Sequence, residues 1–194
     1  MPRRLVRFLP LAFLALLAAC AVPADVDEPP VDMGNFHLGY NIVVVNEPEI
    51  GPFSRKASDE EWKEVLTEAI DRRFGGYDGD KLYHIGIKVD AYALAVPGIP
   101  LVFTPNSVLV LTVSIWDDAT GKPLNEEPKA FTVFEGLSGE TIVSSGLTQT
   151  RKQQMTRLAN NAAKMIQEWI LENPEWVGLP PLPDKAGEDA ASGN

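Results

Sequence analysis

The feature that most constrains the fold is a pair of long stretches in which apolar and polar residues alternate. They cover residues 83–93 and 107–116, and a third, shorter stretch at 130–134 follows turn-forming residues at 117–122. Alternation with a period of two residues is typical of a strand with one buried face, and a segment rich in Asp, Thr and Gly favours a turn. We therefore expect three consecutive antiparallel strands.

The same alternation assigns residues to the second face of the sheet. On that face we expect His84, Gly86, Lys88, Asp90, Tyr92 and Leu94 from the first stretch and Val108, Val110, Thr112, Ser114 and Trp116 from the second. Its aromatic and aliphatic residues are too many for a purely solvated face. A partner, a dimer or a covering loop, such as residues 136–147, is expected there, and Tyr92 and Trp116 are candidate partner contacts.

Two amphipathic helices are expected, each introduced by a capping box. Ser58 with Glu61 begins the first helix, and Thr150 with Gln153 begins the second, which could also start near Thr148. Apolar residues recur at helical spacing in both segments, so each helix has one stripe to bury.

The ends of these helices are also marked. Glycines 75 and 76 predict that the first helix stops through a left-handed residue. Asn173 predicts the end of the second, because a residue before proline disfavours the α conformation. Trp176 is then expected to fold back onto the core.

A β-branched run at residues 42–45 adds a strand ahead of the first helix, with Pro48 at its expected end. The predicted order is therefore β-α-β-β-β-α. Because both helices need one apolar surface, we expect an α+β two-layer sandwich. Its mainly antiparallel sheet has about four strands with both helices on one face, in a single domain at residues 37–178.

The amino-terminal segment has the layout of a secretory signal peptide. Three arginines precede an apolar run from Phe8 to Ala19, and no acidic residue occurs before Asp25. The run has about 12 residues, fewer than the roughly 20 needed for a membrane-spanning helix. A signal peptide at residues 1–19 is therefore expected, and a short core helix is the weaker alternative.

Residues 17–20, Leu-Ala-Ala-Cys, resemble the lipobox of bacterial lipoproteins. This resemblance implies cleavage before Cys20, lipidation of its thiol and acylation of the new amino terminus. Several acyl chains anchor a protein far more firmly than one. The resemblance implies a protein that is anchored by its lipid and faces the periplasm. Ala21 stands where an Asp retains enterobacterial lipoproteins at the inner membrane, so the resemblance favours the outer membrane over the inner one.

The segments beside the domain and the charge limit the possible partners. Residues 20–36 are expected to form a lipidated, proline-rich and acidic tether, and residues 179–194 a disordered tail. Removal of residues 1–19 takes away three of the 17 basic residues and none of the 27 acidic ones, which changes the formal charge from −10 to −13. Such an acidic chain argues against nucleic acid, and a single cysteine cannot form an internal disulfide.

Candidate catalytic residues are few. The chain has two histidines, and His84 is expected on a strand surface near Lys88 and Asp90 without an identifiable nucleophile. Two separated histidines without a free thiol do not make an ordinary zinc site. We therefore expect no enzymatic activity, no cofactor and no metal. A hydrolase that uses Asp90, His84 and a serine is the weaker alternative.

The connection at residues 95–105 is unusually apolar for a loop, and its three prolines keep it out of the strand pairing. It either packs under the sheet edge as core or forms an exposed patch for a partner or membrane. In the second case its candidate contacts are Ile99, Leu101 and Phe103.

The element order from Leu38 to Trp176 resembles the small periplasmic domains of outer-membrane lipoproteins, such as the lipopolysaccharide-assembly lipoprotein and the auxiliary lipoproteins of envelope transporters. The resemblance implies a role in binding or assembly. We expect a lipid-anchored envelope protein that binds a protein partner or a lipid-like ligand in envelope assembly or transport. A structural envelope protein and a small-molecule binder are the alternatives.

Overall fold

A computed structural model of the chain describes residues 31–96, 107–135 and 150–181. By its internal contacts the chain divides into two units, Met1–Asp32 and Met33–Asn194. All the helices and strands given below belong to the second unit. In chain order they are β1 (Phe36–Ile50), α1 (Asp59–Phe74), β2 (Lys81–Ala93), β3 (Val108–Asp117), β4 (Lys122–Pro123), β5 (Lys129–Phe134), α2 (Arg151–Leu171) and the 3-10 helix η2 (Pro174–Val177).

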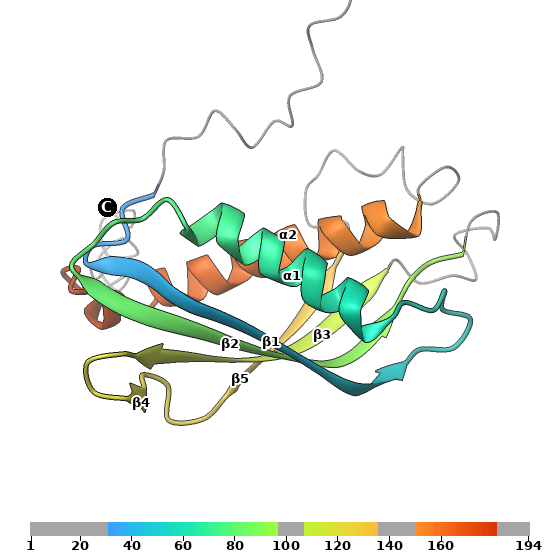
Figure 1. The fold of residues 1–194 in the computed structure, drawn as a ribbon, viewed down its shortest axis with the longest axis horizontal. Coiled ribbons are helices and arrows are strands. Elements are labelled where there is room, and N and C mark those ends of the chain that lie inside the picture. The colour runs from blue at the N-terminus through green and yellow to red at the C-terminus, as the bar shows by residue number, and fades with distance from the viewer. Residues whose placement is uncertain (1–30, 97–106, 136–149, 182–194) are drawn as a thin grey trace, which may run out of the picture. The chain divides into compact units, whose positions relative to one another are not determined.

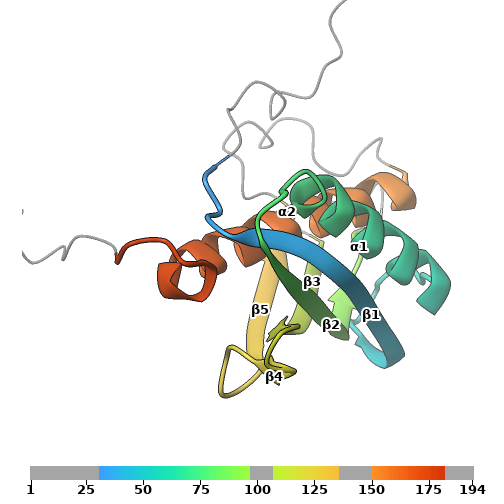
Figure 2. The ribbon, with the colours of Figure 1, turned by 60° about the vertical axis from the view of Figure 1, so that its left-hand side comes forward.

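The strands form one mixed sheet with the main order β1-β2-β3-β5, and the two-residue β4 pairs with the end of β3. β1 and β2 are parallel and are joined through α1, whereas β2, β3 and β5 are consecutive antiparallel neighbours. Both helices lie on the same side of the sheet (Figures 1 and 2). The predicted α+β class, the element order and the three antiparallel strands are confirmed. The short β4 was not predicted.

The first helix begins and buries its apolar stripe as its sequence predicts. The Ser58 side chain accepts from the Glu61 amide at 3.2 Å, and the Glu61 carboxylate accepts from the Ser58 amide at 2.9 Å. The predicted left-handed stop is wrong, because Gly75 is right-handed, with φ −68°, and Gly76 does not have a positive φ either. A side chain there would lie 2.6 Å from the Asp71 carbonyl, so close packing at the helix end accounts for this glycine.

The second helix begins at the Thr150–Gln153 capping box and ends at Leu171. Asn173 then leads into η2, so the expected end is confirmed within two residues. Trp176 folds back, and its ring meets Trp169 edge-on with centroids 5.1 Å apart. Polar side chains also join the two helices to each other, among them Lys152 to Glu64 at 3.0 Å.

The core lies between the helices and the sheet. Trp62 of α1 is fully buried and its ring packs against Tyr92, with centroids 5.2 Å apart. At the other end of the sheet, Phe36 and Tyr83 stack at 5.2 Å. Met33 and Phe36 are buried, so the folded domain begins before the end of the tether predicted at residues 20–36.

Two irregularities in strand register make the structure differ from what the sequence predicts. β1 continues through Pro48 to Ile50, past its expected end, with a register shift between Val45 and Glu49. An edge strand tolerates proline because it has neighbours on one side only. In β2 the register shifts between Val89 and Ala91.

The irregularity in β2 overturns the face predicted for Tyr92. Beyond the shift, Tyr92 and Leu94 point toward the helices, and their side chains are 2% and 1% exposed. The Tyr92 hydroxyl also bonds both the amide and the carbonyl of Ala57 at 3.1 Å. Tyr92 is therefore a core residue, and the prediction that it contacts a partner on the second face is wrong.

Candidate docking face

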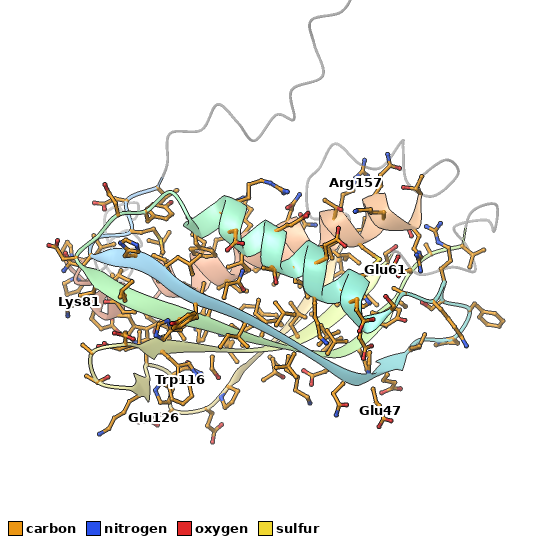
Figure 3. The ribbon with its side chains drawn as sticks, in the orientation of Figure 1. Glu47, Glu61, Lys81, Trp116, Glu126 and Arg157 are labelled. Carbon is orange, nitrogen blue, oxygen red and sulfur yellow. The ribbon has the colours of Figure 1, made fainter. Side chains whose placement is uncertain are left out.

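We call the side of the sheet opposite α1 and α2 the open face. Trp116 lies on this side, below the strands in Figure 3, and its side chain is 42% exposed. Successive side chains of a strand point to opposite faces of the sheet, so the strand register shows which other exposed residues lie on the open face. The large exposed apolar residues of the open face are Ile42, Val44, Leu82, Trp116 and Phe134, together with Tyr40, which the ring contact with His84 places there.

The strand register distributes these residues over the sheet. Ile42 is paired with Gly86 and Val44 with Lys88 across β1 and β2. On β3, Trp116 is paired with His84. The exposed apolar side chains therefore spread over β1, β2, β3 and β5 and alternate with polar ones. Such a mixture of aromatic, aliphatic and polar groups is typical of protein interfaces.

His84 occupies one end of the open face and holds an irregular part of β1. Its Nδ1 accepts the Tyr40 amide at 2.8 Å, and its ring packs against the Tyr40 ring with centroids 5.0 Å apart. The tautomer that satisfies both of its contacts carries the proton on Nε2 and donates it to Asp118 Oδ1 at 2.9 Å. Both ring nitrogens are thus engaged, which gives His84 a structural role in joining β1 to β2.

Gly39 belongs to the same arrangement. A Cβ at this position would lie 2.5 Å from the His84 Nδ1. The imidazole therefore takes the space of a side chain at residue 39, where β1 shifts its register between Leu38 and Asn41.

A second polar group occupies the middle of the open face. Lys88 Nζ donates to Asp90 at 2.8 Å, and the Thr112 hydroxyl donates to the other carboxylate oxygen at 2.5 Å. Burial raises the pKa of Asp90, but the hydrogen bonds from Lys88 and Thr112 and the charge of Lys88 together outweigh it, so the pKa lies below its ordinary value. Asp90 thus stays ionised and neutralises Lys88 within the face.

Gly86 lies between Ile42 of β1 and Ser114 of β3 and has no side chain on the open face. A Cβ built on it would have its nearest heavy atom, the Ser114 carbonyl oxygen, at an ordinary 3.7 Å. Nothing among the described residues therefore requires glycine there. A glycine inside a strand often marks a place where another molecule approaches the backbone closely.

The predicted site residues have different outcomes. Trp116 lies exposed on the open face, and Val108 and Val110 are half-buried on it. Ile99, Leu101 and Phe103, the covering loop at 136–147 and the lipidation site Cys20 lie outside the described residues.

The sequence did not identify Tyr40, Ile42, Val44, Leu82 or Phe134 as open-face residues. The uniform β-branched run at 42–45 gives no period of two, so it indicates a strand without indicating its faces.

The polar groups of the open face do not assemble the hydrolase arrangement considered from the sequence. Asp90 bonds Lys88 and Thr112, whereas His84 pairs with Asp118, so these two residues do not form a pair. Within residues 31–96, 107–135 and 150–181, no group of three or more His, Cys, Asp or Glu side chains could hold a metal ion. None of the helices described is long and apolar enough to cross a membrane.

No family model matches the chain, and no curated protein matches it. The solved structures it resembles include a candidate lipoprotein from Caulobacter crescentus, with 16% identity over 71% of this chain and 89% of that one, at a TM-score of 0.32. A DUF330 protein from Xanthomonas campestris shares 12% identity over 75% and 93%, at 0.40. A candidate homologue of neuraminyllactose-binding hemagglutinin from Helicobacter pylori shares 11% over 81% and 95%, at 0.34. These likenesses are too distant to assign a family.

Proposed function

We propose that this protein is a non-enzymatic, lipid-anchored protein of the bacterial cell envelope that binds another protein through its open face, in envelope assembly or transport. The observation that carries the proposal is the set of exposed aromatic and aliphatic side chains spread over that face. Exposed aromatic and aliphatic side chains interspersed with polar ones are typical of protein interfaces.

The chemistry of the face favours a protein over a lipid-like ligand. Its apolar residues are interspersed with hydrogen-bonding groups that have strict geometry, such as Thr112 and His84. Its central charges, Lys88 and Asp90, neutralise each other, although the mature chain carries a formal charge of −13. A partner can therefore meet the centre of the face without burying an unpaired charge, and polar groups can set its orientation.

The anchor rests on the lipobox-like residues 17–20. In the proposal, Cys20 carries the lipid and the domain faces the periplasm, with the outer membrane favoured by Ala21. Metabolic labelling with palmitate tests this part. We expect the wild-type chain to take up label and Cys20→Ala to take up none, and a labelled Cys20→Ala variant would contradict the anchor.

Site-specific photo-cross-linking in intact cells tests the docking face. A photoreactive phenylalanine analogue replaces Trp116 or Phe134 on the open face, which keeps an aromatic side chain at each position. The matched controls carry the analogue at Lys63 of α1 or Lys164 of α2, both exposed on the helix layer. We expect adducts with another protein from the two open-face positions and little from the controls.

The other outcomes each count against part of the proposal. Adducts of lipid mass from the open face would replace the protein partner by a lipid. Equal yields from all four positions would show that the open face is no preferred contact. Adducts only with a second copy of the chain would replace the foreign partner by self-association.

A further inference from the structure

The outer edge of β1 is a second exposed feature of the sheet. β1 stands at the end of the strand order, and β2 is its strand neighbour among the described residues (Figure 2). It is also long, with 15 residues. A free edge exposes backbone donors and acceptors that can pair with a strand from another chain.

Natural edge strands are usually protected by charges, prolines, bulges or short length. Residues 36–46 of β1 contain no Asp, Glu, Lys or Arg, in a chain whose composition is 23% charged. The charges and the proline begin only at Glu47 and Pro48, and on the other side of residues 41–45 the strand has a register shift between Leu38 and Asn41. The opposite edge is different, because β5 has six residues, starts with Lys129 and is followed by Glu135.

The part of β1 that can pair is well defined. Its register with β2 is regular from Asn41 to Val45 and shifts on both sides of this run. The run is also held in place from the helix side, since Asn41 Nδ2 donates to the Thr67 carbonyl of α1 at 2.9 Å and Val45 is buried. Between them, Ile42 and Val44 expose their side chains on the open face.

We propose that this run pairs antiparallel with the same run of a second copy, around Val43. In that register Ile42 of each copy lies opposite Val44 of the other, which makes two β-branched apolar pairs on one face. The run is thus its own complement, and a twofold arrangement closes after two copies.

Symmetry favours a second copy over an unrelated peptide, because the run is its own complement. Two chains of formal charge −13 repel each other, but this run carries no charge, so pairing along it places no like charges directly opposite each other. The register shift at Glu47 and Pro48 would limit the pairing symmetrically at both ends. The two open faces would then lie on the same side of one continuous sheet.

The tether permits this arrangement on a membrane. About 12 residues separate Cys20 from Met33, and such a segment can extend to roughly 40 Å. Two copies related by a twofold axis normal to the membrane could both reach their anchors. Pairing in this way does not depend on the partner proposed for the open face.

Sedimentation equilibrium of the mature chain, with Cys20→Ser to remove the lipid, tests the pairing. We expect a reversible dimer. The doubly substituted variants Ile42→Lys/Val44→Lys and Ile42→Glu/Val44→Glu place like charges opposite each other, and each should weaken association on the order of 100-fold. An equimolar mixture of the two places opposite charges together and should restore the dimer to within about tenfold of wild type.

Thr132→Lys is the matched control, because Thr132 is exposed on the same face but on β5. It should leave the dimer intact, and dissociation as strong as with the β1 variants would show stacking of faces in place of edge pairing. A monomeric wild type, or a mixture of folded variants that stays monomeric, would overturn the proposal. Should the variants fail to fold, hydrogen exchange of wild type decides. Amides 41–45 must then exchange more slowly above the dimer concentration than below it, and equal rates would overturn the pairing.

Discussion

The same strands supply two faces of the sheet, and the two faces differ in what covers them. On the helix-covered face, side chains such as Ile85 and Leu111 are fully buried beneath α1 and α2. On the open face, Trp116 and Phe134 keep more than two fifths of their surface exposed. Burying a large apolar side chain contributes about 1.5–3 kcal/mol, so the open face leaves a stabilising contribution unused. The apolar side chains of the helix-covered face are buried by folding, whereas those of the open face remain available for burial by a binding partner.

The difference should be largest for the two tryptophans. Trp62 is fully buried against Tyr92, so Trp62→Ala should lower the free energy of unfolding by about 3–5 kcal/mol. Trp116→Ala removes the same side chain from the open face and should cost about 1 kcal/mol or less. Urea unfolding measures both variants. Equal losses would mean that Trp116 is a core residue and that the contrast between the faces is wrong.

Two tyrosines extend the comparison to hydrogen bonding. Tyr92→Phe removes a hydroxyl that bonds the amide and the carbonyl of Ala57, so it should cost about 1–3 kcal/mol. Tyr40→Phe, on the open face with 68% of its side chain exposed, should change stability by less than about 0.5 kcal/mol. Thermal or urea unfolding of both variants checks this, and a silent Tyr92→Phe would contradict the hydrogen bonds.

Two glycines of the sheet should respond with opposite signs. Gly86→Ala places a methyl group where there is room and reduces the freedom of the unfolded chain, so it should stabilise the domain by about 0.4–1 kcal/mol. Gly39→Ala would collide with His84 and should destabilise it by about 1–3 kcal/mol. If Gly86 serves an approaching partner, Gly86→Ala should also reduce cross-linking from Trp116. A destabilised Gly86→Ala would point to a purely internal reason for that glycine.

The smallest expected effects concern the pH dependence of the free energy of unfolding. A residue of the helix-covered face affects it at alkaline pH, and a residue of the open face affects it at acid pH. Burial, with the charge of Asp117 adding to it, raises the pKa of Tyr83 on the helix-covered face. The unfolded chain therefore releases the Tyr83 hydroxyl proton at a lower pH than the folded chain does. The contribution of Tyr83 to the free energy of unfolding is present below a pH of about 10 and declines above it. Asp90 on the open face has a lowered pKa, so its contribution is present above pH of about 4 and declines below it.

Urea unfolding as a function of pH measures these contributions. Tyr83→Phe should flatten the alkaline decline of the unfolding free energy, and Asp90→Asn should flatten the acid decline. Each variant is the control for the other. A variant whose pH profile runs parallel to that of wild type would contradict the pKa shift assigned to that residue.

Much of the fold followed from local patterns, and the exceptions have local physical causes. Both capping boxes and both apolar stripes occur where their residues predict, because caps and helical spacing are short-range features. Tyr92 was assigned to the wrong face because the shift after Val89 inverts the alternation, and no glycine or proline marks that point.

The open face was only partly predictable. Trp116 stands in a clean alternation, which places it correctly. Ile42 and Val44 lie in a uniform β-branched run, which suits a strand buried on both faces as well as an edge strand. They are exposed because both helices cover the other face of the sheet, and the strand order places them on its outermost strand, β1. Strand order depends on contacts between distant segments, which a local pattern does not contain.

The accessibility of single cysteines tests most directly whether the open face is covered in the cell. Ala130→Cys and Thr132→Cys report on the open face, and Lys63→Cys and Lys164→Cys report on the helix layer; all four positions are exposed. The chain has no cysteine besides Cys20, whose thiol is lipidated in the proposed mature form. A membrane-impermeant maleimide should label all four in the purified protein. In permeabilised cells it should label the two helix positions fully and the two open-face positions several-fold more slowly. Equal labelling of all four positions in cells would contradict the account.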